Sequence, residues 1–182
     1  RTEISFNAAP LDVAPALEDQ LFGKKESVVL TSATLSTDGN FDYLRRRSGV
    51  PADSDELLVG SPFDYQRAAL LLIPEDMPQP NSDGYIQAIS QVLIDLARSL
   101  GGHTMALFTS YSSLRGGSQR VREALQAHDI GVMAQSIDGS APQLMTRFAE
   151  NPNNLLLGAS SFWEGVDFPG DLLEILIVVK LP

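Results

Sequence analysis

Two segments of the chain place small polar residues directly after an apolar run, and these are the first candidates for chemistry. The positions concerned are Thr31, Ser32, Ala33 and Thr34 after one run, and Thr109, Ser110 and Tyr111 after another. Hydroxyl side chains of this size can hydrogen-bond across an interface without obstructing it. A helix expected after the second run could also bind a phosphate through its free backbone N–H groups. The alternative, that these residues only form turns, stays open.

A third segment, residues 155–170, combines several kinds of chemistry in one loop. Gly165 permits close approach of the backbone to a ligand, Asp167 can accept hydrogen bonds from a ribose, and Trp163 offers an amphipathic surface. Each residue also has a structural interpretation. Trp163 could be a core or interface aromatic, and Asp167 could cap a loop.

A hydrolase would use Ser160 or Ser161 of this loop as a nucleophile, but the sequence gives that hypothesis little support. The two histidines, His103 and His128, stand in no recognisable triad context, and the chain has no G-x-S-x-G elbow. The phosphate-binding pattern G-x-x-x-x-G-K-[ST] and an Asp-Glu-x-His magnesium box are also absent from the sequence.

Composition limits the classes of function. The chain has 182 residues, a net charge of −10 and no cysteine, which excludes disulfides, thiolate zinc sites and cysteine-bound clusters within it. The acidic balance argues against a basic nucleic-acid surface. Two arginine clusters, at 45–47 and at Arg115, Arg120 and Arg122, could form local positive patches or simply be solvated. No apolar run approaches the roughly 18 residues of a membrane-spanning helix, so no membrane partner is expected.

The elements that position these segments follow from hydrophobic periodicity and from turn residues. Apolar runs predict strands at 27–30, 57–59, 67–73, 105–108, 131–134, 155–157 and 172–179. Helical spacing predicts helices at 41–48, 83–100, 142–149 and from Ser112 or Ser113, as cap, to 125. Residues 74–84 are predicted as a loop. Alternation of apolar strands with helices indicates an α/β fold, with a parallel sheet covered by helices on both faces.

Three short segments stand in a definite order along the chain: Thr-Ser-Ala-Thr-Leu at 31–35, Phe-Thr-Ser-Tyr at 108–111 and Trp-Glu-Gly-Val-Asp-Phe-Pro-Gly at 163–170. Their types and order resemble motifs III, IV and V of superfamily 2 helicases. The third segment most resembles the DinG/XPD branch. The resemblance extends from Pro10-Leu11-Asp12-Val13 to Leu181-Pro182. It implies a RecA-like C-terminal helicase lobe, of the P-loop NTPase type but without a phosphate loop of its own.

The resemblance also implies a role for each motif. The coupling motif Thr31, Ser32, Ala33 and Thr34 would link the nucleotide state to lobe movement. The residues expected to contact single-stranded DNA are Thr109, Ser110, Tyr111, Ser160, Ser161 and Trp163. Glu164, Gly165 and Asp167 are expected on the nucleotide side. Contacts through hydroxyls and backbone N–H groups need little positive charge, which reduces the objection raised by the net charge.

For the domain organisation, we expect a leading segment at 1–26 that belongs to a preceding lobe, followed by a helicase lobe at 27–182 that stops before the family's last motif. The longer protein would hydrolyse ATP, with Mg²⁺ bound mainly by the other RecA-like lobe, and would move on single-stranded or forked DNA. A 5′ to 3′ direction, a role in DNA repair or replication and a cytoplasmic location are expected. The chain alone would bind neither cofactor and would be inactive. The alternative is a non-motor α/β module that binds a nucleotide or a partner.

Overall fold

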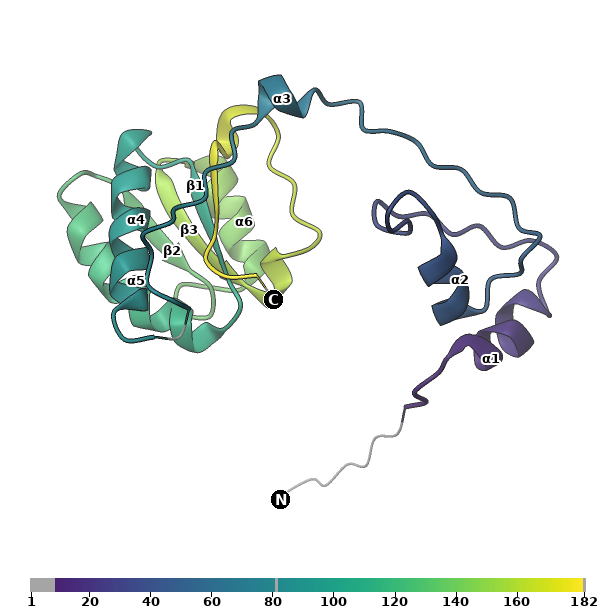
Figure 1. The fold of residues 1–182 in the computed structure, drawn as a ribbon. Coiled ribbons are helices and arrows are strands. Elements are labelled where there is room, and N and C mark those ends of the chain that lie inside the picture. Colours follow the sequence, from purple (N-terminus) through teal and green to yellow (C-terminus); the bar gives the residue numbers. More distant parts are fainter. Residues whose placement is uncertain (1–8, 81, 182) are drawn as a thin grey trace, which may run out of the picture. The chain divides into compact units, whose positions relative to one another are not determined.

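A computed structural model describes residues 9–80 and 82–181, which form parts of two compact units, residues 1–71 and 72–182 (Figure 1). Three parts of the chain lie outside the described residues: the first eight residues of the predicted leading segment, Asn81 of the predicted loop, and Pro182. In the part of the chain that is described, no helix is long and apolar enough to cross a membrane.

The first unit consists of short helices joined by extended chain. Helix α1 (Ala14–Leu17) continues into a π-helical turn, Glu18–Phe22. Helix α2 (Asp42–Ser48) ends at Gly49, which adopts the left-handed conformation that commonly ends a helix, with φ of 69°. Helix α3 (Tyr65–Ala68) is a single turn. The prediction of a helix at 41–48 that stops at Gly49 is therefore confirmed.

The three strands predicted in the region of the first unit, at 27–30, 57–59 and 67–73, are not formed. Part of the third range is helix α3, and the rest is extended chain. These runs remain exposed, with Val29 at 84% and Leu70 at 82%. A strand is stabilised by a ladder to a neighbour, and within 9–71 the described residues form only one isolated bridge, between Thr37 and Asn40. The predictions are wrong because apolar composition supplies no pairing partner.

The second unit is built on a four-stranded parallel sheet. Its strands are β1 (Thr104–Phe108), β2 (Gly131–Ala134), β3 (Asn154–Ala159) and β4 (Ile175–Val178), in the order β2-β3-β1-β4. All three neighbouring pairs are parallel, with Phe108 of β1 opposite Ala159 of β3. The carboxyl ends of the strands therefore share one edge of the sheet.

Helices cover both faces of this sheet (Figure 1). Helices α4 (Tyr85–Ser99) and α5 (Tyr111–Gln126) pack on one face, where Leu93 and Phe108 are buried. Helix α6 (Ala141–Glu150) packs on the other face, where Phe148 is buried with Met105. Each fully buried side chain of this size contributes roughly 1.5–3 kcal/mol. The predicted fold class, an α/β parallel sheet with helices on both faces, is confirmed.

The predicted elements of the second unit are formed with small differences at their ends. The helix predicted to begin at a Ser112 or Ser113 cap is instead capped by Ser110, whose hydroxyl accepts a hydrogen bond from the backbone N–H of Ser113 at 3.3 Å. Strand β4 is shorter than the predicted 172–179 and is not buried on both faces, since Leu176 is 52% exposed. It is an edge strand of the described sheet.

Tyr85 connects the first turn of α4 to the segment after β4. Its hydroxyl donates a hydrogen bond to the backbone carbonyl of Val179, and burial raises the pKa of this phenol above its ordinary value. The bond fixes the end of β4 against the helix layer.

Candidate functional site

Segments far apart in the sequence meet at the carboxyl edge of the sheet. The loop after β1 carries Thr109 and Ser110, and the loop after β3 begins at Ser160. Because β1 and β3 are neighbours, these loops start side by side, and the segment that follows β2 lies next to the second loop. In open α/β sheets, ligands bind at this edge.

The loop after β1 is short because α5 begins at Tyr111. The hydroxyl of Ser110 donates to that of Ser113 at 2.9 Å and lies 3.1 Å from the hydroxyl of Ser112. Ser110 is therefore half-buried in the helix cap, whereas Thr109 is exposed. The two adjacent hydroxyls predicted to bind DNA differ in how much of their hydrogen-bonding capacity the fold already uses.

The loop after β3 turns sharply into a short 3-10 helix, Ser160–Phe162. Ser160 has a φ of 28°, in the region that non-glycine residues rarely adopt. The turn carries Phe162 back over the strand, where its side chain occupies the space above Gly158, at which any Cβ would lie 2.6 Å from the Cβ of Phe162. Ser160 and Ser161 remain exposed on the outer side of the turn.

Trp163 joins this loop to the end of β1. Its indole N–H donates to the backbone carbonyl of Phe108 at 3.0 Å, and its ring packs, partly buried, against the apolar cluster on the α6 face. The carbonyl of Phe108 is thereby satisfied at the point where the strand ends. The structure thus gives Trp163 a packing contact, while its predicted contact with DNA stays a prediction.

A second connection runs through Gln135, the residue directly after β2, which is 6% exposed. Its side-chain amide donates to the hydroxyl of Tyr111 at 3.1 Å and to that of Ser161 at 2.8 Å. Its amide oxygen accepts from the backbone N–H of Ala159 at 2.7 Å. Gln135 is not among the residues predicted from the sequence, where its only signal is its place directly after a strand.

The three residues predicted on the nucleotide side lie farther along the same loop. Glu164 and Asp167 are exposed, and neither carboxylate has a hydrogen-bond partner among the residues that the structure describes. Gly165 has a φ of 72°, so glycine suits this position, and no atom lies within 4 Å of where a Cβ would be. Val166 and Phe168, on either side of Asp167, pack against the apolar cluster on the α6 face. This packing anchors the loop while the carboxylate of Asp167 faces outward.

The coupling motif belongs to the first unit. Thr31, Ser32, Ala33 and Thr34 are all exposed and form a turn rather than the end of a strand. The hydroxyl of Ser32 accepts from the backbone N–H of Thr34 at 3.2 Å. This local bond is of the kind that serine makes in turns.

Both predicted arginine patches are smaller than the sequence alone suggests. Arg45 pairs with Glu56 at 2.9 Å, and Arg122 pairs with Asp138 at 2.7 Å and also donates to the carbonyl of Val132. Arg46, Arg47, Arg115 and Arg120 remain exposed. The ion pairs direct Arg45 and Arg122 to neighbours in the fold rather than to a ligand.

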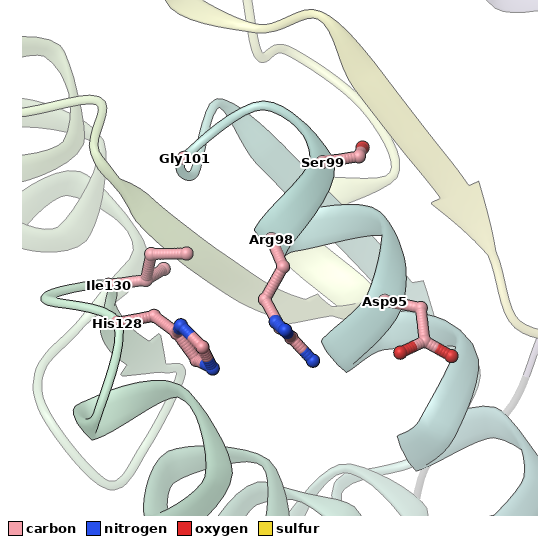
Figure 2. A pocket seen from close by; sticks show the side chains of 6 residues that line it. All are labelled: Asp95, Arg98, Ser99, Gly101, His128 and Ile130. Atoms are coloured by element: carbon pink, nitrogen blue, oxygen red, sulfur yellow. The ribbon is translucent and has the colours of Figure 1, made fainter.

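One hollow of the second unit lies away from the carboxyl edge. It measures about 470 Å³ and is lined by the end of α4 and the segment before β2, which places it toward the amino ends of the strands. Arg98 lies between His128 and Asp95 there (Figure 2). None of the predicted site residues lines it. Within residues 9–80 and 82–181, no group of three or more histidine, aspartate or glutamate side chains could hold a metal ion.

Comparison with known proteins gives consistent matches. A family model described as "Helicase C-terminal domain" matches residues 93–182. The chain is 35% identical over its whole length to the "3'-5' exonuclease DinG" of Bacillus subtilis, of which it covers 20%. It is 35% identical to the "ATP-dependent DNA helicase YoaA" of Escherichia coli and to the "ATP-dependent helicase DinG" of Mycobacterium tuberculosis, over 95% and 97% of the chain and 26% of each relative. The chain thus spans about a quarter or less of the length of these relatives. No solved structure matches it.

Proposed function

The chain belongs to the DinG family, with a match to the helicase C-terminal domain at residues 93–182, and from this premise we propose that it is the second motor lobe of an ATP-dependent DNA helicase. The observation that carries the proposal is the hydrogen-bonded junction of two predicted motifs at one sheet edge, Tyr111 with Ser161 through Gln135. In a motor lobe, the two motifs at this edge must move together when the bound nucleotide changes, and this hydrogen-bonded link would join them.

In the proposed division of labour, exposed hydroxyls hold the backbone of single-stranded DNA. Thr109, Ser160 and Ser161 are exposed, and Ser110 and Tyr111 are half-buried beside them. Phosphate oxygens accept hydrogen bonds from hydroxyls and backbone N–H groups, and such contacts position a strand without reading its sequence. They also suit a chain with a net charge of −10. Trp163 would contribute the apolar side of its ring.

On the nucleotide side, Glu164, Gly165 and Asp167 would face ATP held mainly by the preceding lobe. The free carboxylates of Glu164 and Asp167 and the open space at Gly165 support this assignment. Mg²⁺ is proposed to be bound together with ATP, mainly by the preceding lobe. Thr31, Ser32, Ala33 and Thr34 would transmit the nucleotide state between the lobes.

The leading segment 1–26 is proposed to belong to that preceding lobe, and 27–182 to the second. For the longer protein we propose movement 5′ to 3′ along single-stranded or forked DNA, in repair or replication. A DNA substrate of this kind favours a cytoplasmic location. Relatives named ATP-dependent helicases support the coarse activity, namely ATP use on DNA.

The proposal is tested by DNA-stimulated ATP hydrolysis in the full-length protein and in this chain alone. We expect activity in the former, none in the latter, and a loss of about 10- to 100-fold on Asp167→Ala, because a hydrogen bond to a charged group contributes about 1.5–3 kcal/mol. Asp171→Ala is the matched control, since Asp171 is an exposed carboxylate on the same loop, outside the motif. A full-length protein that binds DNA but never hydrolyses ATP would instead favour the non-motor binding module.

A further inference from the structure

Gln135 is a buried polar side chain whose hydrogen bonds are directed at both candidate DNA-binding segments. Few polar side chains in the described residues are as buried, and a buried amide is tolerated where its groups find partners. Here both N–H bonds of the amide and its oxygen are used, by Tyr111, Ser161 and Ala159. The partners are the first residue of α5, a residue of the 3-10 turn after β3, and the last residue of β3.

The orientation of the amide follows from the hydrogen-bond network. The backbone N–H of Ala159 can only donate, so the atom that faces it must be the oxygen of Gln135. The nitrogen therefore faces the two hydroxyls. An amide nitrogen only donates, so the hydroxyl oxygens of Tyr111 and Ser161 must both act as acceptors toward it.

This arrangement leaves the hydrogen of each hydroxyl free to donate elsewhere. Neither hydroxyl has another hydrogen-bond partner among residues 9–80 and 82–181. A phosphodiester oxygen accepts hydrogen bonds and donates none. The hydroxyls of Tyr111 and Ser161 accept from Gln135, so each still has its own hydrogen to donate to such an oxygen. Donation from Gln135 also polarises both hydroxyls and strengthens their onward bonds.

We propose that Gln135 is a positioning residue for the DNA backbone: it fixes the loops after β1 and β3 together and presents Tyr111 and Ser161 as hydrogen-bond donors to phosphates of the bound strand. This inference rests on the proposed function, because it takes the ligand to be single-stranded DNA. It adds a residue that the motif resemblance did not select and states the direction of the hydrogen bonds.

Gln135→Glu is the most direct test, because it changes the direction of two bonds and preserves the third. A carboxylate can still accept from Ala159, but it must also accept from Tyr111 and Ser161 and would draw their hydrogens away from the phosphate. Gln135→Met removes all three bonds at similar length without adding charge. Gln126→Met is the matched control, since Gln126 is exposed at the end of α5.

The measurement is ATP hydrolysis by the full-length protein as a function of the concentration of an oligo(dT) strand. Gln135→Glu is expected to raise the half-saturating DNA concentration about 10-fold or more while the maximal rate changes less than about twofold, with a smaller increase for Gln135→Met and none for Gln126→Met. In a Tyr111→Phe/Ser161→Ala background, Gln135→Met should add little further loss, because residues that act together are not additive. Equal loss of maximal rate in all Gln135 variants, or full additivity, would overturn the proposal.

Hydrogen exchange at residues 159–165 of the full-length protein separates this inference from the proposed function. Gln135→Met should speed exchange in this loop, because its link to the end of β2 is lost. If exchange is unchanged, Gln135 does not position the loop and the inference fails whatever the activity. The opposite result is also possible: the wild type shows no DNA-stimulated hydrolysis, but Gln135→Met still speeds exchange in the loop. In that case the proposed function fails, while the positioning of the loop by Gln135 stands.

Discussion

Thr109 and Ser110 are adjacent hydroxyl residues that the sequence cannot tell apart, but their surroundings make different predictions. Ser110 caps α5, so Ser110→Ala should lower the free energy of unfolding by about 1 kcal/mol. Thr109 is exposed, and Thr109→Ala should change stability by less than about 0.5 kcal/mol while weakening single-stranded DNA binding by the full-length protein.

Urea unfolding of the chain, followed by circular dichroism, measures the first effect, and a titration of the full-length protein with a fluorescent DNA strand measures the second. Equal loss of stability in the two variants would contradict the assignment of the cap to Ser110. DNA affinity unaffected by Thr109→Ala would remove this hydroxyl from the proposed DNA contacts.

The sequence predicts the local environment of a residue only where the residue type restricts it, as for glycine or for a charged side chain. Gly165 has a positive φ, which suits glycine, and the carboxylate of Asp167 is exposed, while the roles of both residues toward a nucleotide stay predictions. The bond from Trp163 to Phe108 and the three bonds of Gln135 could not be predicted, because they join residues brought together only by the strand order β2-β3-β1. Sequence spacing does not give that order.

At the scale of elements, the packing of β3 against the loop that follows it depends on Gly158. A Cβ at this position would lie 2.6 Å from the Cβ of Phe162, whose place is set by the backbone and which therefore cannot move away by side-chain rotation. Gly158→Ala should therefore cost about 1–3 kcal/mol of stability. Gly116→Ala is the control. Gly116 lies within α5 and its Cβ would meet only the methyl group of Ile86 at 3.8 Å, so a gain of about 0.5–1 kcal/mol is expected.

Thermal unfolding of the two variants compares them directly. A Gly158→Ala protein as stable as the wild type would show that Phe162 has another position available, and the tight turn after β3 would then not depend on glycine. A destabilised Gly116→Ala protein would show that the α4 and α5 layer has no space for a methyl group there.

Helices were predicted more accurately than strands, and the reason is physical. A helix such as α4 satisfies its backbone bonds internally, and its apolar face at Ile89 and Leu93 is visible in the sequence. A strand needs a neighbour. The runs at 105–108, 131–134 and 155–157 pair with one another in the sheet, whereas the equally apolar runs at 27–30 and 57–59 have no strand partner among residues 9–71. Composition predicted the apolar runs but not their pairing.

At the scale of the whole molecule, the exposed apolar runs of the first unit predict a difference between the chain and the full-length protein. Residues 27–30 belong to an apolar run of the kind that favours strands. They nevertheless form no backbone hydrogen bond with the described residues, and Val29 is 84% exposed. If this run pairs as a strand only in the full-length protein, its amides should exchange rapidly in the chain alone and at least about 100-fold more slowly in the full-length protein.

Hydrogen exchange measured by mass spectrometry on both proteins tests this, with 155–157 of β3 as an internal control that should be protected in each because it pairs on both sides. High protection of 9–25 in the chain alone would contradict the assignment of the leading segment to another lobe. High protection of 27–30 in the chain alone would show that this run does not depend on the rest of the protein for a partner. Rapid exchange of 27–30 in both proteins would leave the run without a strand partner anywhere. The coupling motif that follows it would then have no rigid element through which to act, and the proposed transmission between lobes would fail at Thr31 to Thr34.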